Sequence, residues 1–363
     1  MAEIKHIAKQ AVKGVPFLQK ELARRLSLQT GRVFTTPTTY YVIFSGRCNI
    51  ECTFCKIRKL VDPTLSGEVM FRIISEAKAL SGKGFNISLS GGEPLIYKPL
   101  YDALALSRKI GVNFGFTTNG VTLTKAKVEK VIAYDPFNIN VSLESVDPAI
   151  NESLRPMRHG TRKALEGIEN LLAEKERTGS RVSIIVKPTI MEQNYRVLPD
   201  LVRHFGKHSK VQVNFQPYVG DKGDPFWVRD LDDLRRVFNE IRELRREGYS
   251  VMGDKRQYQG FWEYLSDPPM DGHMRHLDLG GEKRNCDIGL RSLFIYPNGD
   301  VFFCDFLKQA IGNVHQDSLS KIYYGPVANA QRRKMIHCNI DCQQTCKRPT
   351  PLWEKARTFL HMG

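Results

Sequence analysis

The stretch TYYVIFSGRCNIECTFC, residues 39–55, joins a strand pattern to three closely spaced cysteines. Its first seven residues are rich in β-branched and aromatic side chains, which predicts a β-strand. Directly after this strand come Cys48, Cys52 and Cys55, with the aromatic Phe54 beside the last. A structural zinc ion needs four ligands, and no fourth cysteine or histidine follows within the loop. An iron–sulfur cluster needs only thiolates, and three of them leave one iron open to another ligand.

The same strand pattern, followed by a helical segment, repeats along the chain as far as residue 220. The predicted strands are residues 39–45, 86–90, 113–118, 138–143, 181–187 and 211–216. The segments between them have helical periodicity and end at glycines, as at 71–84 and 164–179. Six such repeats predict an α/β fold with a parallel sheet, either open or a partial TIM-like barrel. Functional side chains gather at the carboxyl ends of such strands.

A different pattern follows the repeats. A charged helix is expected at 230–248, and residues 249–281 have no regular period. Two β-rich runs then flank Asn298-Gly299, a strong hairpin signal. We therefore expect three parts: a basic N-terminal helical extension (1–37), a βα-repeat domain that is an open sheet or a partial (β/α)6 barrel (38–235), and an α+β domain built on a β-hairpin (236–363).

The composition excludes several classes of protein. Of 363 residues, 41% are hydrophobic and 26% charged, as in a globular enzyme. No apolar run approaches the roughly 18 residues of a membrane span, and lysines interrupt any signal peptide. We therefore expect a cytoplasmic protein without a transmembrane segment.

The charge balance favours anionic partners. The chain carries 54 Lys and Arg against 39 Asp and Glu, a net charge of +15. Nucleic acid is a less favoured partner, because no basic tail or RNA-binding motif accompanies this charge. Near the N-terminus, Phe17, Leu18, Leu22 and Leu26 have helical spacing. This helix is expected to cover one end of the domain; the alternative is a peripheral membrane contact.

The cysteine loop resembles the signature of the radical S-adenosylmethionine (SAM) superfamily, C-x3-C-x2-C with an aromatic before the last cysteine. In that family the three cysteines hold a [4Fe–4S] cluster whose open iron binds SAM. The resemblance implies that Cys48, Cys52 and Cys55 are the catalytic cluster ligands, and that Phe54 contributes to the SAM site.

Polar motifs at the later strand ends extend this resemblance. SGGEP (90–94) is similar to the motif that binds the amino group of SAM, TTNG (117–120) to a family turn, and VSLES (141–145) to the ribose-binding strand. Taken alone, each motif also fits an ordinary turn or strand end. The implied SAM contacts are Gly91, Gly92, Glu93, Thr118, Asn119, Ser142, Glu144 and, for the SAM carboxylate, Arg155. Weaker candidates are Arg158, Lys187, Gln216 and Tyr218.

A second cysteine group resembles the SPASM and twitch extensions, which are C-terminal modules of radical SAM enzymes that carry auxiliary iron–sulfur clusters. Cys286, Gly299 and Cys304 match the C-x(9–15)-G-x4-C opening of these modules. Fewer cysteines follow than two clusters need, so one auxiliary [4Fe–4S] cluster is expected. Its preferred ligands are Cys286, Cys304, Cys342 and Cys346, with Cys338 a substitute ligand or a free thiol. A four-cysteine zinc site is the alternative.

The resemblance implies that SAM is cleaved reductively to a 5′-deoxyadenosyl radical, which removes a hydrogen atom from a substrate. We expect oxidation or radical coupling of a small molecule or peptide, with flavodoxin or ferredoxin as reductant. The alternatives are epimerisation with Cys338 as hydrogen donor, modification of an isoprenoid or lipid, and a non-catalytic iron–sulfur or zinc protein. Cyclisation of the molybdopterin type is disfavoured because that family ends in a glycine pair, whereas this chain ends His361-Met362-Gly363. Peptide modification is weakened because the short N-terminus leaves no room for a leader-peptide recognition domain, although such enzymes can lack one. Candidate substrate contacts are Tyr258, Trp262, Glu263 and His273.

Overall fold

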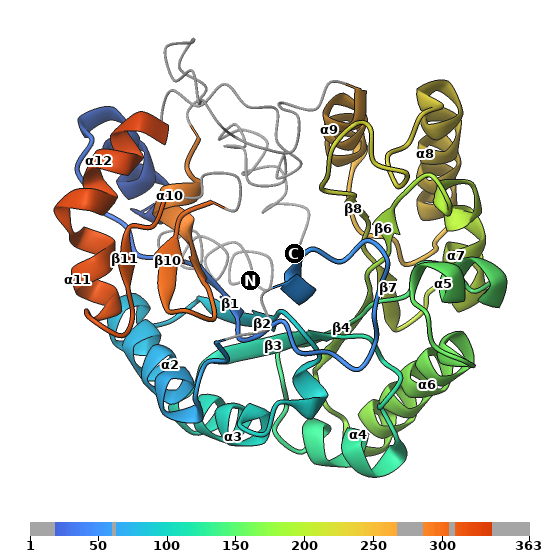
Figure 1. Cartoon of the computed structure of the whole chain (residues 1–363), viewed down its shortest axis with the longest axis horizontal. Helices are drawn as coiled ribbons and strands as arrows, with labels where there is room; N and C mark the ends of the chain where they lie inside the picture. The colour runs from blue at the N-terminus through green and yellow to red at the C-terminus, as the bar shows by residue number, and fades with distance from the viewer. Residues whose placement is uncertain (1–18, 60–62, 267–285, 305–308, 336–363) are drawn as a thin grey trace, which may run out of the picture.

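The computed structural model describes residues 19–59, 63–266, 286–304 and 309–335 (Figure 1). Six parallel strands lie side by side at one end of its main sheet, and helices cover the outer face of that sheet (Figure 1). The strands are β1 (Thr39–Ile43), β2 (Asn86–Ser90), β3 (Asn113–Thr118), β4 (Asn138–Val141), β5 (Ser183–Val186) and β7 (Val211–Val213). The predicted partial barrel is confirmed.

The two connecting helices predicted at 71–84 and 164–179 are present, but each begins four residues earlier, at Gly67 and Gly160. Helix α2 (Gly67–Ser81) buries Met70, Ile73, Ile74 and Ala77, which lie on one face at helical spacing. It ends at Gly82, whose φ of 67° is costly for other residues. The other barrel helices are α3 (Leu100–Ile110), α4 (Lys125–Ile132), α5 (Pro148–Leu154), α6 (Gly160–Thr178) and α7 (Leu198–Phe205), with short 3-10 helices at Ile57–Lys59, Pro94–Ile96 and Tyr195–Val197.

The predicted hairpin continues the barrel sheet. Strand β9 (Ser292–Ile295) pairs in parallel with β1, and β10 (Asp300–Phe302) and β11 (Gly312–Asn313) follow on its far side. The sheet order is therefore β11-β10-β9-β1-β2-β3-β4-β5-β7. Helices α10 (Ile288–Arg291), α11 (Leu319–Tyr324) and α12 (Pro326–Met335) belong to this part of the chain. Sequence periodicity identified the hairpin but not its partner strand.

Residues 249–281 were expected to be irregular, and this expectation was wrong for α9 (Lys255–Ser266). This helix packs against α8 (Leu231–Arg246), which runs across the predicted boundary at 235. Phe261 and Leu265 are among the side chains it buries. Two short strands, β6 (Thr189–Ile190) and β8 (Gln216–Pro217), form a second sheet beside it. The domain boundaries themselves stay a prediction.

The N-terminal helix, described at residues 19–30, turns a different face inward from the one expected. Leu22 and Leu26 are 59% and 40% exposed, whereas Glu21 and Arg24 are buried. The polar side chains are buried because they make ion pairs, which periodicity does not reveal. Phe17 and Leu18 lie outside the described residues.

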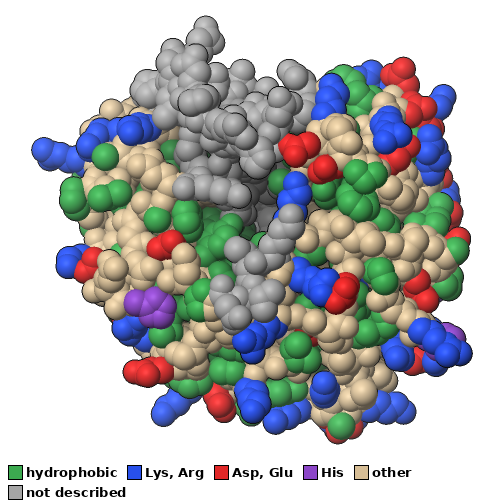
Figure 2. Space-filling model, viewed as in Figure 1, with side chains coloured by type: hydrophobic (Ala, Val, Ile, Leu, Met, Phe, Trp, Pro, Cys, Tyr) green, Lys and Arg blue, Asp and Glu red, His purple; other side chains and the backbone are tan. Residues whose placement is uncertain are grey.

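Two properties of the surface bear on the expected partners. Basic and acidic side chains are interspersed over the face shown in Figure 2, so the positive charge is not gathered into one patch there. Within the described part of the chain, the helices are too short or too polar to cross a bilayer.

Candidate active site

The three cysteines of the first group line one pocket at the carboxyl ends of β1–β4. The pocket is partly open to solvent. Its lining residues are Gly46, Cys48, Ile50, Cys52, Phe54, Cys55, Ser90, Gly91, Gly92, Glu93, Thr117, Thr118, Asn119, Ser142 and Arg155. Every residue that the sequence assigned to the SAM site is among them except Glu144.

The three cysteine thiols line one pocket. All three are partly exposed. Sulfurs around one zinc lie within about 4 Å of one another, because each Zn–S bond is about 2.3 Å. In the described residues no three His, Cys, Asp or Glu side chains come together closely enough to hold a single metal ion. Cluster cysteines bind separate irons and can lie further apart. Burial raises the pKa of Cys52 to about 11, so iron must displace its proton.

The glycine pair after β2 allows that strand end to pack against the cysteine loop. Gly92 N–H donates to the Ser45 carbonyl (2.7 Å), and Glu93 N–H donates to the Arg47 carbonyl (3.0 Å). A Cβ on Gly92 would lie 1.7 Å from the Arg47 oxygen, and one on Gly91 would lie 2.5 Å from the Ser45 oxygen. The sequence suggested that the two glycines let the backbone approach a ligand. The structure shows that they also let the end of β2 approach the backbone of the cysteine loop.

Glu93 connects the ends of β2 and β3. Its buried carboxylate accepts hydrogen bonds from Leu95 N–H (3.0 Å), Thr118 Oγ1 (2.7 Å) and Asn119 N–H (2.8 Å). Burial raises the pKa of Glu93, and these donors offset part of that effect. Asn119 also donates to Asn49 Oδ1 (2.8 Å) in the cysteine loop. The three strand ends are thereby held in one arrangement.

Ser142 lines the pocket, but Glu144 does not. Glu144 is fully buried, and its Oε1 accepts from Arg155 Nε (3.0 Å) and Nη2 (2.5 Å). Its Oε2 accepts from the backbone N–H of Thr189 (2.6 Å). Glu144 therefore holds the Arg155 guanidinium in this structure, and its expected ribose contact stays a prediction. Alternation along a strand gives the face of a side chain but not its partner.

Arg155 connects the Glu144 carboxylate to the cysteine loop. Its Nη1 lies 3.3 Å from Cys52 Sγ, and its guanidinium lies 5.3 Å from the centre of the Phe54 ring. Burial opposes the charge on Arg155, but the Glu144 carboxylate outweighs this and raises the guanidinium pKa. The contact with Cys52 was not expected from the sequence. The sequence showed only that an acidic residue, Glu144, and a basic residue, Arg155, stand eleven positions apart after one strand.

The four weaker candidates are not among the residues that line the pocket. Arg158 is exposed, and Lys187 does not line the pocket. Gln216 donates to Thr189 Oγ1 (3.2 Å), and Tyr218 donates to Asp224 Oδ2 (2.8 Å).

Three of the expected substrate contacts have packing or surface roles in α9. Tyr258 is 3% exposed and donates to the Met252 carbonyl (3.0 Å), and Trp262 donates to the Leu231 carbonyl (3.2 Å). Glu263 accepts from Gln259, one turn away (3.1 Å). These roles need no substrate, and the expected substrate contacts of the three residues stay a prediction. His273 lies outside the described residues.

Only part of the second cysteine group can be placed. Cys286 and Cys304 are partly exposed and flank β9 and β10. Cys338, Cys342 and Cys346 lie outside the described residues, so the auxiliary ligand set stays a prediction.

Comparison with known proteins gives two family matches. The family described as the Radical SAM superfamily matches residues 42–195, and the iron–sulfur cluster-binding domain SPASM matches residues 286–348. The mycofactocin maturase MftC of Mycolicibacterium smegmatis is 25% identical over 312 residues, 85% of this chain and 73% of MftC. The sporulation killing factor maturation protein SkfB of Bacillus subtilis is 22% identical over 310 residues, 84% of this chain and 69% of SkfB.

A solved structure shares the fold. SuiB of Streptococcus suis, bound to its precursor peptide SuiA, superposes with a TM-score of 0.62 at 20% identity, covering 87% of this chain and 71% of SuiB. At this identity the likeness supports the fold alone.

Proposed function

Because the chain belongs to the radical SAM superfamily and carries a C-terminal SPASM domain, we propose that it modifies a peptide by radical chemistry. The family implies a [4Fe–4S] cluster with SAM, and the SPASM domain implies auxiliary iron–sulfur binding, as the sequence predicted. When bound, the cluster and SAM supply a 5′-deoxyadenosyl radical that abstracts a hydrogen atom from the substrate.

One observation supports SAM cleavage above all others: the cysteines, the glycine pair, Ser142 and Arg155 line a single pocket. In this proposal the three thiolates hold the cluster, and the backbone at Gly91 and Gly92 meets the amino group of SAM. Ser142 meets the ribose hydroxyls. Arg155, fixed by Glu144, presents positive charge beside the cluster and the SAM carboxylate.

The substrate class comes from the relatives. MftC and SkfB are named for maturation, and SuiB was solved with a precursor peptide. We therefore favour a peptide over the isoprenoid and small-molecule alternatives. Oxidation or coupling remains our expected outcome, with epimerisation by a Cys338 thiol as the second candidate.

The test of SAM cleavage is anaerobic reconstitution with iron and sulfide, followed by SAM and dithionite. The wild-type chain should form 5′-deoxyadenosine, and Cys52→Ser should form none. Arg155→Gln should reduce the rate about ten-fold or more, because a charged hydrogen bond is lost. Arg158→Gln is the matched control and should react as wild type, since Arg158 is exposed and outside the pocket.

Two results would count against the proposal in different ways. A folded, iron-loaded chain that forms no 5′-deoxyadenosine would end the enzymatic proposal. If 5′-deoxyadenosine forms but mass spectrometry finds no change in any precursor peptide tried, including those encoded beside its gene, only the peptide assignment fails.

A further inference from the structure

A largely buried arginine contacts the sulfur of one of the three cysteines in the first group. Arg155 Nη1 donates to Cys52 Sγ at 3.3 Å, and the Arg155 side chain is only 12% exposed. Both residues line the same pocket. Nearby charge and hydrogen bonds to cluster sulfurs are two of the properties that set the reduction potential of an iron–sulfur cluster. The Arg155 guanidinium supplies both of them at Cys52.

The Glu144 carboxylate is the counter-ion of the same guanidinium. Its Oε1 accepts from Nε (3.0 Å) and Nη2 (2.5 Å) of Arg155, whereas Nη1 faces Cys52. Glu144 is fully buried and does not line the pocket. The guanidinium therefore has one edge on the carboxylate and its remaining nitrogen on the sulfur, so the carboxylate offsets part of the positive charge beside Cys52.

Three further contacts hold Glu144 in place. Its backbone N–H donates to Asn151 Oδ1 (2.9 Å), and its carbonyl accepts from Asn194 Nδ2 (3.0 Å). Its Oε2 accepts from the backbone N–H of Thr189 (2.6 Å). Asn151 and Asn194 are 3% and 1% exposed, so these contacts are shielded from water. The position of the Arg155 cation relative to Cys52 is therefore determined jointly by the ends of β4 and α5 and by the start of β6.

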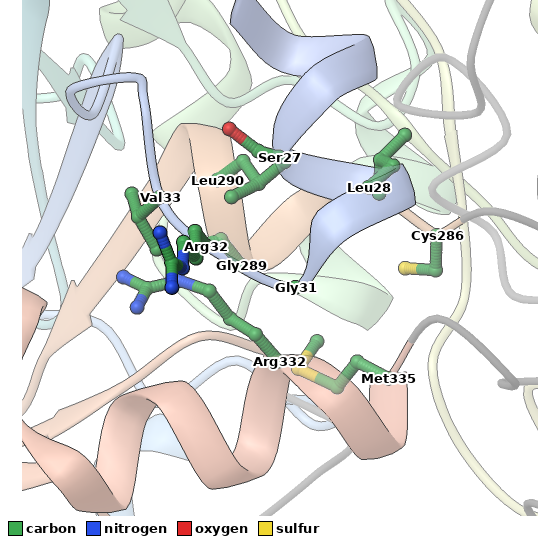
Figure 3. Close-up of a pocket in the computed structure, with 10 residues that line it drawn as sticks. All are labelled: Ser27, Leu28, Gly31, Arg32, Val33, Cys286, Gly289, Leu290, Arg332 and Met335. Carbon is green, nitrogen blue, oxygen red and sulfur yellow. The ribbon is translucent and has the colours of Figure 1, made fainter.

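A second pocket, between the N-terminal helix and α12, shows that this sulfur contact depends on orientation (Figure 3). Its lining also includes a cysteine, Cys286, and a buried arginine, Arg332. Arg332 donates to the backbone carbonyls of Gly289 (2.8 Å) and Tyr323 (2.7 Å), and its guanidinium points away from Cys286 in Figure 3. A buried arginine in the same pocket as a thiol is therefore not enough to place a cation on the sulfur.

We propose that Arg155 raises the reduction potential of the cluster held by the first cysteine group, and that Glu144 limits this effect. Uptake of one electron from an external reductant adds one negative charge beside Cys52, and the Arg155 cation stabilises that charge. Glu144 is a positioning residue, because it acts through Arg155. The inference rests on the proposed function for the presence of the cluster. It gives Arg155 a role at the cluster that does not require SAM.

The test follows reduction of the reconstituted full-length chain at a series of set potentials, with dithionite as reductant and electron paramagnetic resonance as the readout. SAM is left out, so its carboxylate contributes nothing. The spectrum of Cys52→Ser, which should lose this cluster, is subtracted. Arg155→Gln should make the equilibrium constant for reduction about ten-fold smaller, which is a shift of about 59 mV to more negative potential. Glu144→Gln should shift the potential in the opposite direction, because the cation loses its counter-ion.

The controls separate a charge effect from a general structural effect. Arg155→Lys keeps the charge and should lie closer to the wild-type chain than Arg155→Gln does. Arg162 and Glu166 form an exposed ion pair on α6, 63% and 49% exposed, outside the pocket. Arg162→Gln and Glu166→Gln are therefore the matched controls and should leave the potential as in wild type.

The two main variants must shift the potential in opposite directions. The proposal is overturned if both leave it unchanged or both shift it the same way. If one of them does not bind iron, the sign of the other's shift relative to Arg155→Lys decides. Formation of 5′-deoxyadenosine by the wild-type chain is measured separately: a chain that cleaves SAM but whose variants show no opposite shifts fails only this inference, not the proposed function.

Discussion

Gly92 determines how the cysteine loop lies on the sheet. Its backbone N–H donates to Ser45, and a side chain at this position would overlap the Arg47 carbonyl. The sequence motif predicted that this glycine contacts the ligand. The structure shows that the loop needs the same glycine before any ligand binds, because a carbonyl oxygen occupies the space of a Cβ.

Gly92→Ala should therefore lower the free energy of unfolding by about 3 kcal/mol or more and prevent cluster loading, because overpacking against backbone cannot relax easily. Gly223→Ala is the control and should change stability by less than about 0.5 kcal/mol, since nothing lies within 4 Å of its Cβ. Urea unfolding and iron content measure both effects. Equal stability of the two variants would show that the loop can move away from β2.

The aromatic side chains of helix α9 have packing roles inside the fold. Its aromatic side chains pack on α8 and on the end of the barrel: Tyr258 lies against Phe238 and Phe261 at ring-centre distances of 5.3 and 6.1 Å. The helix was missed because Gly, Asp and Pro on either side obscure its period. Burial by α8 supplies the stability that local propensity does not.

Tyr258→Phe should cost about 1 kcal/mol, because it removes the hydrogen bond to the Met252 carbonyl and keeps the ring. The rate of 5′-deoxyadenosine formation should not change. Tyr324→Phe, at a 43% exposed position, should leave both quantities as in wild type. Lower substrate turnover by Tyr258→Phe at unchanged stability would restore Tyr258 as a substrate contact.

At the scale of the whole molecule, the C-terminal hairpin completes the barrel sheet. Strand β9 pairs with β1 over Thr39–Val42, and Phe294 stacks on Tyr41 with ring centres 4.6 Å apart. Helix α2 adds a second contact through Glu76, which accepts from Leu319 N–H (2.7 Å). The strand that leads into the cysteine loop thus has a partner on each side.

Removing residues 286–363 should expose the β1 edge and cause aggregation, because an unpaired edge strand is a template for pairing with other chains. Size-exclusion chromatography should show large species for a chain that ends at 285. A chain that ends at 335 keeps β9 and should elute as the full-length protein does. If both truncated chains elute alike, the β1–β9 pairing does not protect the sheet.

The sequence by itself determined the α/β class with a parallel sheet, the cysteine loop and the polar strand ends, because strand periodicity and the shared carboxyl edge of parallel strands depend only on local pattern. It also placed the hairpin at Asn298-Gly299. Only the tertiary structure decided that Glu144 holds Arg155, that β9 pairs with β1, and that Arg24 reaches Asp287. The two partners of each contact are far apart in sequence or do not belong to one periodic pattern. A buried charge pairs with the opposite charge that the fold brings near it, and local sequence patterns do not predict which residue that is.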